Sequence, residues 1–277
     1  MKKLFNNVAI IGVGLIGGSM ALGIKKKGLA SRIIGVSRHK STLIWANKNR
    51  VIDKGSQDLR IIQDADLVIL ATPVNTILNL ADLISKFIKE DCVVCDVGST
   101  KAEIVSKLSN IFPNYVGSHP LSGSEKRGIQ NASADIFKNS VCILTPTNNT
   151  NPMALNKIRR MWRELGARVV LLPPDKHDRI LSFVSHLPHI VAFSLIGIIP
   201  DEYLRFGSSG LKDATRIALS DSQLWTDIFL SNKKYVMKAI GLLHGNLSQI
   251  ESAIRKRDRK LLTRTLREAK EKRGILN

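Results

Sequence analysis

The spacing of hydrophobic positions changes once along the chain, near residue 173. Before that point, short apolar runs of strand length alternate with segments whose apolar residues recur at helical spacing, such as Ile77, Leu80 and Ile84. The runs cover residues 8–11, 32–38, 66–73, 92–97, 141–145 and 168–172, with a further short run that ends before residue 119. Strands that alternate with helices predict an α/β fold with a Rossmann-type, doubly wound and mostly parallel sheet, which binds ligands at the carboxyl ends of its strands.

The second part of the chain, after the pair Pro173 and Pro174, is expected to be entirely helical. Helical patterns cover residues 175–199, 210–220, 223–243 and 247–272. We therefore predict a dinucleotide-binding domain at 1–173 and a helical domain for dimerisation and substrate binding at 174–277. Asp175 and Asp178 resemble an N-terminal capping pair for the first helix, and Pro188 is expected to bend or break that helix.

Residues 182–199 form the best candidate for a membrane-spanning segment. Three serines, two histidines and a proline argue against a membrane-spanning helix, so the pattern predicts a buried helix. Such an uncharged stretch in the helical half is also typical of the core of a homodimer interface.

A glycine-rich turn follows the first strand directly. Gly12, Gly14 and Gly17 form a G-x-G-x-x-G pattern that contains Leu15 and Ile16, and residues 20–24 after it are typical of the opening of a helix. The first glycine permits the turn, the second lets a pyrophosphate approach the backbone, and the third lets the helix pack on the strand. The pattern favours a dinucleotide site over an ordinary glycine-rich turn, with further cofactor contacts expected from Thr72 and Pro73 at the end of a later strand.

The end of the second strand indicates which nucleotide is bound. NAD-binding folds commonly place an acidic residue there for the adenosine ribose, but residues 32–52 contain no acid. Ser37 and Arg38 instead offer a hydroxyl and a guanidinium that suit a 2′-phosphate. NADP is therefore favoured over NAD, and the alternative is a solvated basic loop beside a site that takes NAD.

The chain is strongly basic, with 42 Lys and Arg against 23 Asp and Glu and a net charge of +19. The excess is densest at 255–273, where ten basic residues face three acids. We interpret this stretch as the solvated face of a last amphipathic helix rather than a nucleic-acid site, because no aromatic residues or recognised motif accompany it. A positive field of this kind also attracts small anionic ligands.

The cysteines and the N-terminus indicate a cytoplasmic protein. Three cysteines are too few for a disulfide framework, and no signal-peptide hydrophobic region precedes the first strand. Cys92 and Cys95 form a C-x-x-C pattern, but they fall in a strand whose alternation points them to opposite faces. We therefore interpret both as core residues.

Polar residues at two strand ends are candidates for chemistry. Ser99 follows the strand at 92–97, where it either faces a ligand or caps the next helix together with Thr100. His119 follows a short strand and lies in a loop rich in glycine and serine. It can exchange a proton with a ligand there, or it is an ordinary solvated histidine.

The helical half offers a second set of candidates. Asp213 and Arg216 are three residues apart, either as a surface ion pair or as a guanidinium positioned for a substrate carboxylate. His186 and His189 are one turn apart, and their spacing alone favours satisfied core histidines. Because His177 is more than two turns away, no third ligand is expected and a metal site is not predicted.

Five motifs in register resemble the prephenate/arogenate dehydrogenases of tyrosine biosynthesis. They are Gly-Val-Gly-Leu-Ile-Gly-Gly-Ser at 12–19, Asp-Val-Gly-Ser-Thr-Lys at 96–101, Gly-Ser-His-Pro-Leu-Ser-Gly-Ser-Glu at 117–125, Ser-His-Leu-Pro-His at 185–189 and Asp-Ala-Thr-Arg-Ile-Ala at 213–218. The resemblance implies a nucleotide-binding domain followed by a helical domain through which two chains dimerise. It also implies oxidative decarboxylation of prephenate to 4-hydroxyphenylpyruvate, with hydride transfer to NAD(P).

The resemblance further implies a role for each site residue. His119 would take the proton of the ring hydroxyl, Ser99 would orient it, and Arg216 would hold the ring carboxylate. The remaining matched positions, which would line the pocket for the substrate side chain, are His189, Glu125 and Trp225.

Three alternatives remain open at this point. Arogenate is the nearest alternative substrate, although His189 in the side-chain pocket favours prephenate, which lacks the ammonium group of arogenate. A hydroxyacid dehydrogenase of another family shares the nucleotide fold, but the motif order argues against it. A nucleotide-sensing or nucleic-acid-binding protein that uses the basic C-terminal helix is the alternative of another class.

Overall fold

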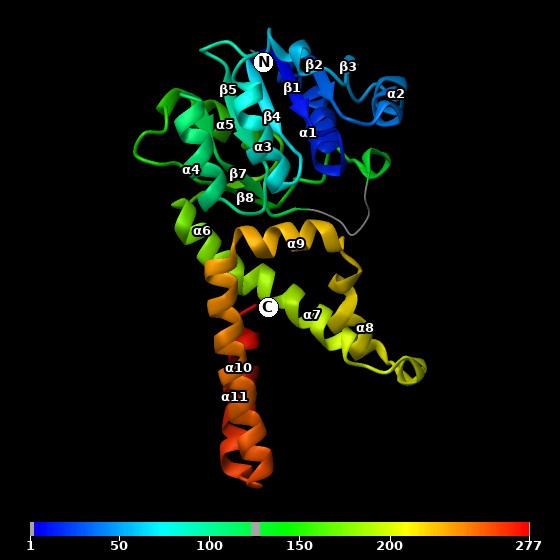
Figure 1. The fold of residues 1–277 in the computed structure, drawn as a ribbon, viewed down its shortest axis with the longest axis vertical. Helices are drawn as coiled ribbons and strands as arrows, with labels where there is room; N and C mark the ends of the chain where they lie inside the picture. The colour runs from blue at the N-terminus through cyan, green and yellow to red at the C-terminus, as the bar shows by residue number, and fades with distance from the viewer. Residues whose placement is uncertain (1–2, 123–127, 277) are drawn as a thin grey trace.

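We describe the protein from a computed structural model, in residues 3–122 and 128–276. Figure 1 shows an α/β part at one end and a helical part at the other. The chain changes from strands to helices between β9, Arg168–Leu171, and α6, Pro174–Leu181. Helix α9, Ser222–Ser231, lies across the junction of the two parts (Figure 1).

The α/β part is built on a six-stranded sheet in which every pair of neighbouring strands is parallel. The strands are β1 Phe5–Ile11, β2 Ala30–Val36, β3 Lys54–Ser56, β4 Leu67–Leu70, β5 Val93–Asp96 and β6 Tyr115–Val116, in the spatial order β3-β2-β1-β4-β5-β6. The order reverses between β1 and β4, which opens a crevice at the carboxyl ends of these strands. The predicted doubly wound sheet is confirmed.

Helices cover both faces of this sheet because both faces of its strands are apolar. On one face, Met20, Ile24 and Trp162 pack on alternate residues of the strands, and on the other face Ile77 and Ile104 do so. The helices involved are α1 Leu15–Lys26, α2 Lys40–Lys48, α3 Val74–Ile84, α4 Ala102–Ile111 and α5 Pro152–Glu164. Cys92 and Cys95 lie in the opposite clusters, and both thiols are buried and free, as their alternation predicts.

The strands at 141–145 and 168–172 do not extend this sheet, so the prediction of one sheet through residue 172 is wrong. β7 Ser118–Pro120, β8 Val141–Leu144 and β9 form a separate three-stranded sheet, in which β7 is antiparallel to β8. The described residues between β7 and β8 contain only the short 3-10 helix η2, Ile129–Asn131, whereas parallel neighbours are usually joined by a crossover α-helix. His119 consequently lies within β7 rather than in a loop after it.

The first long helix is not broken at Pro188. Helix α6 continues through a π-helical segment, η3 Ser182–His186, into α7 Leu187–Gly197. Pro188 lies in the first turn of α7. At a helix start and beside the wider π turn, the missing N–H of proline destabilises the helix little. The capping prediction is also wrong, because Asp175 accepts a hydrogen bond from the Tyr235 hydroxyl and Asp178 binds the start of α4 instead.

One break that the pattern predicts between the remaining helices is absent from the structure. They are η4 Asp201–Phe206, α8 Ser209–Thr215, η5 Arg216–Leu219, α9, α10 Lys233–Arg255 and α11 Arg259–Gly274. The expected break between 243 and 247 is absent, because α10 runs through it and the chain turns at Arg257, whose φ is 53°. Helices α10 and α11 form a long hairpin that extends away from the α/β part (Figure 1).

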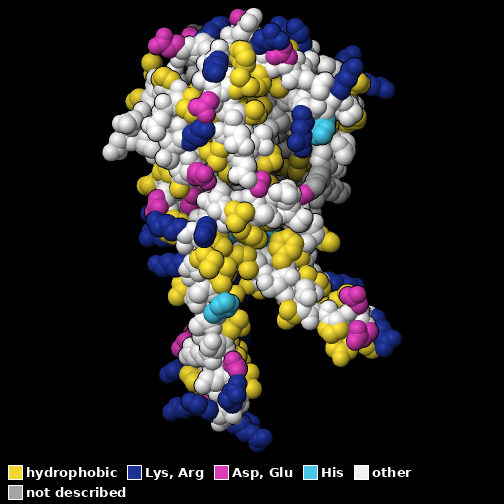
Figure 2. All heavy atoms as spheres, viewed as in Figure 1, with side chains coloured by type: hydrophobic (Ala, Val, Ile, Leu, Met, Phe, Trp, Pro, Cys, Tyr) yellow, Lys and Arg dark blue, Asp and Glu magenta, His cyan; other side chains and the backbone are white. Residues whose placement is uncertain are grey.

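Residues 174–197 form the one helix, among the described residues, that is apolar and long enough to cross a membrane by length and composition. Its mean hydropathy over the most apolar window is 1.7, but only 22% of that window is buried within the chain. The prediction of a buried helix is therefore wrong for a single copy. Apolar side chains lie at the surface where the helical part meets the α/β part (Figure 2).

Candidate active site

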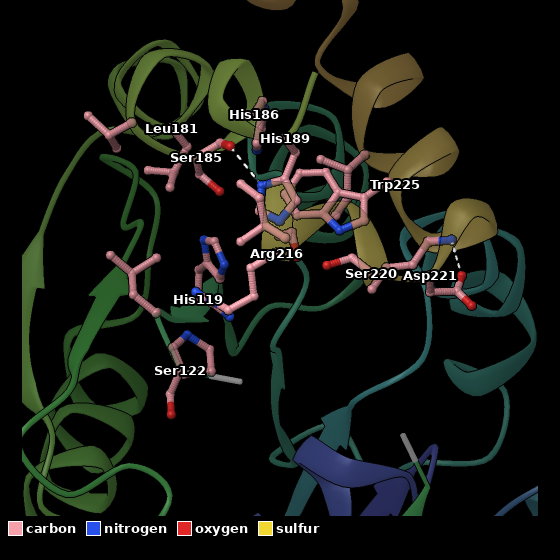
Figure 3. Close-up of a pocket in the computed structure, with 17 residues that line it drawn as sticks. His119, Ser122, Leu181, Ser185, His186, His189, Arg216, Ser220, Asp221 and Trp225 are labelled. Atoms are coloured by element: carbon pink, nitrogen blue, oxygen red, sulfur yellow. Dashed lines mark hydrogen bonds between the residues drawn. The ribbon is translucent and has the colours of Figure 1, made fainter. Parts of the chain in front are cut away.

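A cavity of about 510 Å³ lies where the helical part meets the α/β part. Figure 3 shows its labelled side chains arranged around one shared space. The walls come from both parts of the chain and consist of Ser99, His119, Pro120, Leu121, Ser122, Leu181, Val184, Ser185, His186, His189, Arg216, Ile217, Ser220, Asp221, Leu224, Trp225 and Ile228. His119 of the α/β part and Arg216 of the helical part thus face one cavity.

His119 is held rigidly because β7 pairs with β8 at this residue. Its Nδ1 atom lies 2.8 Å from Nε2 of His177, on α6. Burial lowers the pKa of His119 well below 6.5, and the neighbouring His177 ring and the positive charge of Lys101 lower it further. The imidazole is therefore neutral near pH 7 and can accept a proton.

Ser99 lies half-buried on the cavity wall, in the loop between β5 and α4. The alternative that Ser99 or Thr100 caps α4 is wrong. The carboxylate of Asp178 accepts hydrogen bonds from the backbone N–H groups of Lys101 and Ala102, at 2.7 and 2.8 Å, and so caps the helix from the other part of the chain. The Thr100 hydroxyl instead contacts that of Ser231.

A buried ion pair supports the same loop from behind. The Lys101 ammonium binds the Asp96 carboxylate, and neither side chain is exposed to solvent. Asp96 also accepts hydrogen bonds from the Tyr115 hydroxyl and the Gly98 N–H, at 2.7 and 2.8 Å. Because all of these groups are satisfied, the strand end that carries Ser99 has a fixed geometry.

The helical wall of the cavity carries a guanidinium and two histidines. Arg216 extends from η5 into the labelled group of Figure 3. The rings of His189 and Trp225 stack with centroids 3.4 Å apart, and His189 Nδ1 donates to the Ser185 carbonyl at 3.0 Å. Burial lowers the pKa of His189, so this ring is neutral near pH 7 and its Nε2 is an acceptor.

His186 lies deeper in the same wall. Its Nδ1 accepts a hydrogen bond from the Asn232 side chain at 3.1 Å, and burial lowers its pKa to about 4. His186 and His189 are hydrogen-bonded as core histidines are, but both line the cavity, so the interpretation of the pair as core residues alone is wrong.

Two further predicted site residues, and one residue that was not predicted, have different outcomes. Asp213 is exposed at the end of α8 and is not among the described residues that line the cavity. Glu125 lies outside the described residues. The spacing of His177 from the other histidines argues only against a metal site, and His177 contacts His119 and Asp178 in the structure; its neighbour Asp178 is the one hint of this role in the sequence.

The glycine turn fits a bound dinucleotide. Gly12 has a φ of +98°, and a Cβ there would lie 2.6 Å from the Ala71 carbonyl and 2.8 Å from the Thr72 side chain. A Cβ at Gly17 would lie 2.1 Å from the Gly12 carbonyl, whereas Gly14 faces open space. Neither Gly12 nor Gly17 can carry a side chain, and Gly14 leaves room for a ligand.

The first helix adds a binding surface for anions beside this turn. α1 begins at Leu15, and its N-cap Gly14 supplies no side-chain hydrogen bond. Leu15 and Ile16 are half-buried there, and Pro73 begins α3 across the crevice. Backbone N–H groups at such a helix start favour a pyrophosphate.

The end of β2 carries the residues expected to choose between nucleotides. Ser37 accepts a hydrogen bond from the His39 N–H at 3.2 Å, and the Arg38 Nε donates to the His39 ring at 3.0 Å. Arg38 is exposed, so its remaining N–H groups can meet an anion.

A parallel sheet with this glycine turn, joined by a shared cavity to a helical part, defines a nicotinamide-nucleotide-dependent dehydrogenase. The family models agree. Residues 20–171 match the nucleotide-binding domain of prephenate dehydrogenase, and residues 173–268 match its dimerization domain. The chain belongs to the prephenate dehydrogenase family.

Individual relatives span the whole chain. It is 34% identical to the prephenate dehydrogenase of Bacillus subtilis, over 100% of this chain and 77% of that protein. It is 32% identical to the cyclohexadienyl dehydrogenase of Zymomonas mobilis, over 99% of this chain and 97% of that protein.

Solved structures are equally similar. The prephenate dehydrogenase of A. aeolicus, in complex with hydroxyphenyl propionate and NAD+, is 36% identical with a TM-score of 0.93 and covers 98% of each chain. The arogenate dehydrogenase of Synechocystis is 29% identical with a TM-score of 0.84, over 98% of this chain and 100% of that one.

Proposed function

We propose that this protein oxidises and decarboxylates prephenate to 4-hydroxyphenylpyruvate, with NADP as the preferred hydride acceptor. The observation that carries the proposal is the cavity that places a neutral imidazole, His119, and a guanidinium, Arg216, around one space. Prephenate has a ring hydroxyl for the first group and a ring carboxylate for the second. Its anionic charge also suits a chain of net charge +19.

Each wall of the cavity has a distinct task in this proposal. His119 accepts the hydroxyl proton, Ser99 orients the pair, and Arg216 holds the ring carboxylate until it leaves as carbon dioxide. His189 and Trp225 face the substrate side chain, together with Glu125 in the matching motif. Asp213, three residues before Arg216, is assigned the task of positioning its guanidinium.

The cofactor is assigned to the crevice at the glycine turn. Gly12, Gly14 and Gly17, together with Leu15 and Ile16, would hold the pyrophosphate. Thr72 and Pro73 would contact the nucleotide from the other side of the crevice. When bound there, the nicotinamide supplies the hydride acceptor.

NADP is preferred because of the end of β2. Ser37 and Arg38 offer a hydroxyl and a partly unengaged guanidinium to a 2′-phosphate, and no carboxylate stands at the strand end to repel it.

Arogenate is the second candidate substrate, and one observation favours it. His189 donates its Nδ1–H to the Ser185 carbonyl, so its Nε2 presents a lone pair. A lone pair matches the ammonium of arogenate better than the keto acid of prephenate. His189 therefore favours prephenate less than its position in the side-chain pocket suggests. Kinetics with both substrates decide between them: kcat/KM for arogenate equal to or above that for prephenate would reverse our order.

The protein is proposed to act as a homodimer. Apolar side chains of α7, α9 and α10 line a groove of about 420 Å³, which contains Ile190, Phe193, Phe229, Leu230, Val236, Met237 and Ile240. Leu230 and Met237 are 66% and 57% exposed in the single chain. A second copy would cover them, and the family's dimerization domain matches this region.

Two substitutions test the assignment of roles in the cavity. His119→Asn is expected to lower kcat by ~10²-fold or more while NADP binding stays nearly intact, because a positioned base contributes on that scale. Arg216→Ala is expected chiefly to raise KM for prephenate. Arg163→Ala, an exposed arginine on α5, is the control and should change neither constant. A wild-type kcat in His119→Asn would remove the imidazole from the mechanism.

A further inference from the structure

A line of hydrogen-bonding groups continues behind His119, away from the cavity. His119 Nδ1 lies 2.8 Å from His177 Nε2, and His177 Nδ1 lies 2.8 Å from Asp178 Oδ1. Neither His177 nor Asp178 is more than 1% exposed. The two imidazole rings are tilted by 59°, so each presents a nitrogen to the next group rather than a ring face.

We propose that His177 and Asp178 are positioning residues that keep the ring proton of His119 on Nδ1, so that Nε2 holds the lone pair which accepts the substrate hydroxyl proton. The inference rests on the proposed function, because it concerns the base of that reaction. In this arrangement, α6 of the helical part fixes the protonated nitrogen of the base through two hydrogen bonds.

Asp178 is the fixed end of this line of groups. Its carboxylate accepts hydrogen bonds from the backbone N–H groups of Lys101 and Ala102, at the start of α4. The Asn232 side chain also donates to the Asp178 backbone carbonyl at 2.8 Å. The carboxylate therefore sits at the positive end of a helix with its position fixed, and an ionised carboxylate only accepts hydrogen bonds.

The protons of both rings follow from that acceptor. His177 must carry its proton on Nδ1 to donate to Asp178, because a lone pair there would face a carboxylate oxygen at 2.8 Å. A neutral His177 then has its lone pair on Nε2, and His119 must donate its Nδ1–H to it. Nε2 of His119 is left without a proton on the cavity side of the ring.

The chain of donors requires His177 to be neutral. Burial lowers the pKa of His177, an effect that the hydrogen bond to Asp178 opposes and that positive charge at Lys101 reinforces. A doubly protonated His177 would donate to both neighbours and force the proton of His119 onto Nε2, where it blocks the reaction. In the proposed step the substrate O–H bond breaks, an Nε2–H bond forms, and the positive charge stays on His119, with Asp178 as the nearest carboxylate along the line.

The ring nitrogens report the arrangement directly. In ¹⁵N-histidine NMR of the wild-type protein, with the His119 signals identified by their loss in His119→Asn, we expect the Nδ1–H form at pH 7.5. The Nε2–H form would overturn the proposal. This measurement needs no substrate, so it stands even if the protein turns over neither prephenate nor arogenate, which would refute the proposed function alone.

Three variants then separate positioning from structure. His177→Leu removes the acceptor and should lower kcat by ~10- to 100-fold, with KM and the Kd for NADP+ within about twofold of wild type and with mixed protonation of His119. His177→Gln can accept from His119 through its carbonyl and donate to Asp178 through its amide, so kcat should return to within about fivefold of wild type. Lys176→Leu, at the exposed neighbouring position, is the control and should match wild type.

A kcat for His177→Leu within twofold of wild type, or a His177→Gln enzyme as slow as His177→Leu, would show that His177 does not position the base. If His177→Leu does not fold, the His177→Gln kinetics and the wild-type NMR signals still decide the matter.

Discussion

Replacing Lys101 by methionine tests how the buried framework behind the cavity supports both stability and chemistry. Methionine keeps most of the side-chain volume but removes the ammonium that binds Asp96, where both side chains are fully buried. Three hydrogen bonds to Asp96 remain, from the Tyr115 hydroxyl and from the backbone N–H groups of Gly98 and Ser118. The carboxylate is nevertheless left in the interior without a cation.

The structure sets the size of the effect. Removing one partner of a buried ion pair costs about 3–5 kcal/mol. For a chain of this size each kcal/mol lowers Tm by about 2–4 °C, so Lys101→Met should melt about 6–20 °C below wild type. Lys107→Met is the matched control on the same helix, because Lys107 pairs with Asp82 at the surface, where the side chains are 38% and 68% exposed. Its Tm should stay within about 2 °C of wild type.

A second readout comes from the base itself. Positive charge at Lys101 lowers the pKa of His119, so its loss raises that pKa. A base must be unprotonated, and the acid limb of the kcat/KM profile should therefore move to higher pH in Lys101→Met and stay in place in Lys107→Met. Differential scanning fluorimetry and a pH–rate profile measure the two effects. A Lys101→Met protein with the wild-type Tm and the wild-type acid limb would refute the reasoning.

Three further outcomes follow from the structure. Arg38→Ala should raise the Kd for NADP+ by ~10-fold or more and that for NAD+ little, with Lys48→Ala on α2 as the control; equal losses for both nucleotides would show that Arg38 contacts no phosphate. The pKa of His186 is lowered by burial to about 4, so the unfolded chain binds the extra proton between about pH 4 and 6.5, and stability falls as the pH drops through that window. This group alone should lower the free energy of unfolding by about 2 kcal/mol between pH 7 and pH 5 in urea titrations at constant salt, and a flat profile would contradict the neutral buried ring. Met237→Asp should convert a dimer to a monomer in light scattering after gel filtration, and an unchanged mass would place the interface elsewhere.

Local patterns predict the parallel sheet and the glycine turn of the nucleotide half, but not its second, three-stranded sheet. The apolar run before Gly12 and the lack of an acid after β2 are features of consecutive residues, so they can be read directly from the sequence. The opposite faces that Cys92, just before β5, and Cys95, within it, occupy follow from strand alternation in the same way. β3 escaped prediction because its three residues, Lys54–Ser56, carry no apolar side chain.

Long-range contacts could not be predicted from such patterns. The hydrogen bond between His119 and His177 joins residues 58 positions apart, on a strand and a helix from different parts of the chain. The capping of α4 by Asp178 replaces a nearer candidate, Ser99, for the same reason. The π-helical segment before Pro188, which contacts α10, likewise has no signature in the hydrophobic spacing of residues 175–199.

The most direct test of the account is to incubate the purified protein with prephenate and NADP+, and to measure NADPH, carbon dioxide and 4-hydroxyphenylpyruvate together. Arogenate and NAD+ complete the four combinations. The account predicts the three products in equal amounts, with the highest kcat/KM for prephenate and NADP+. Reduction of neither nucleotide by either substrate would contradict it.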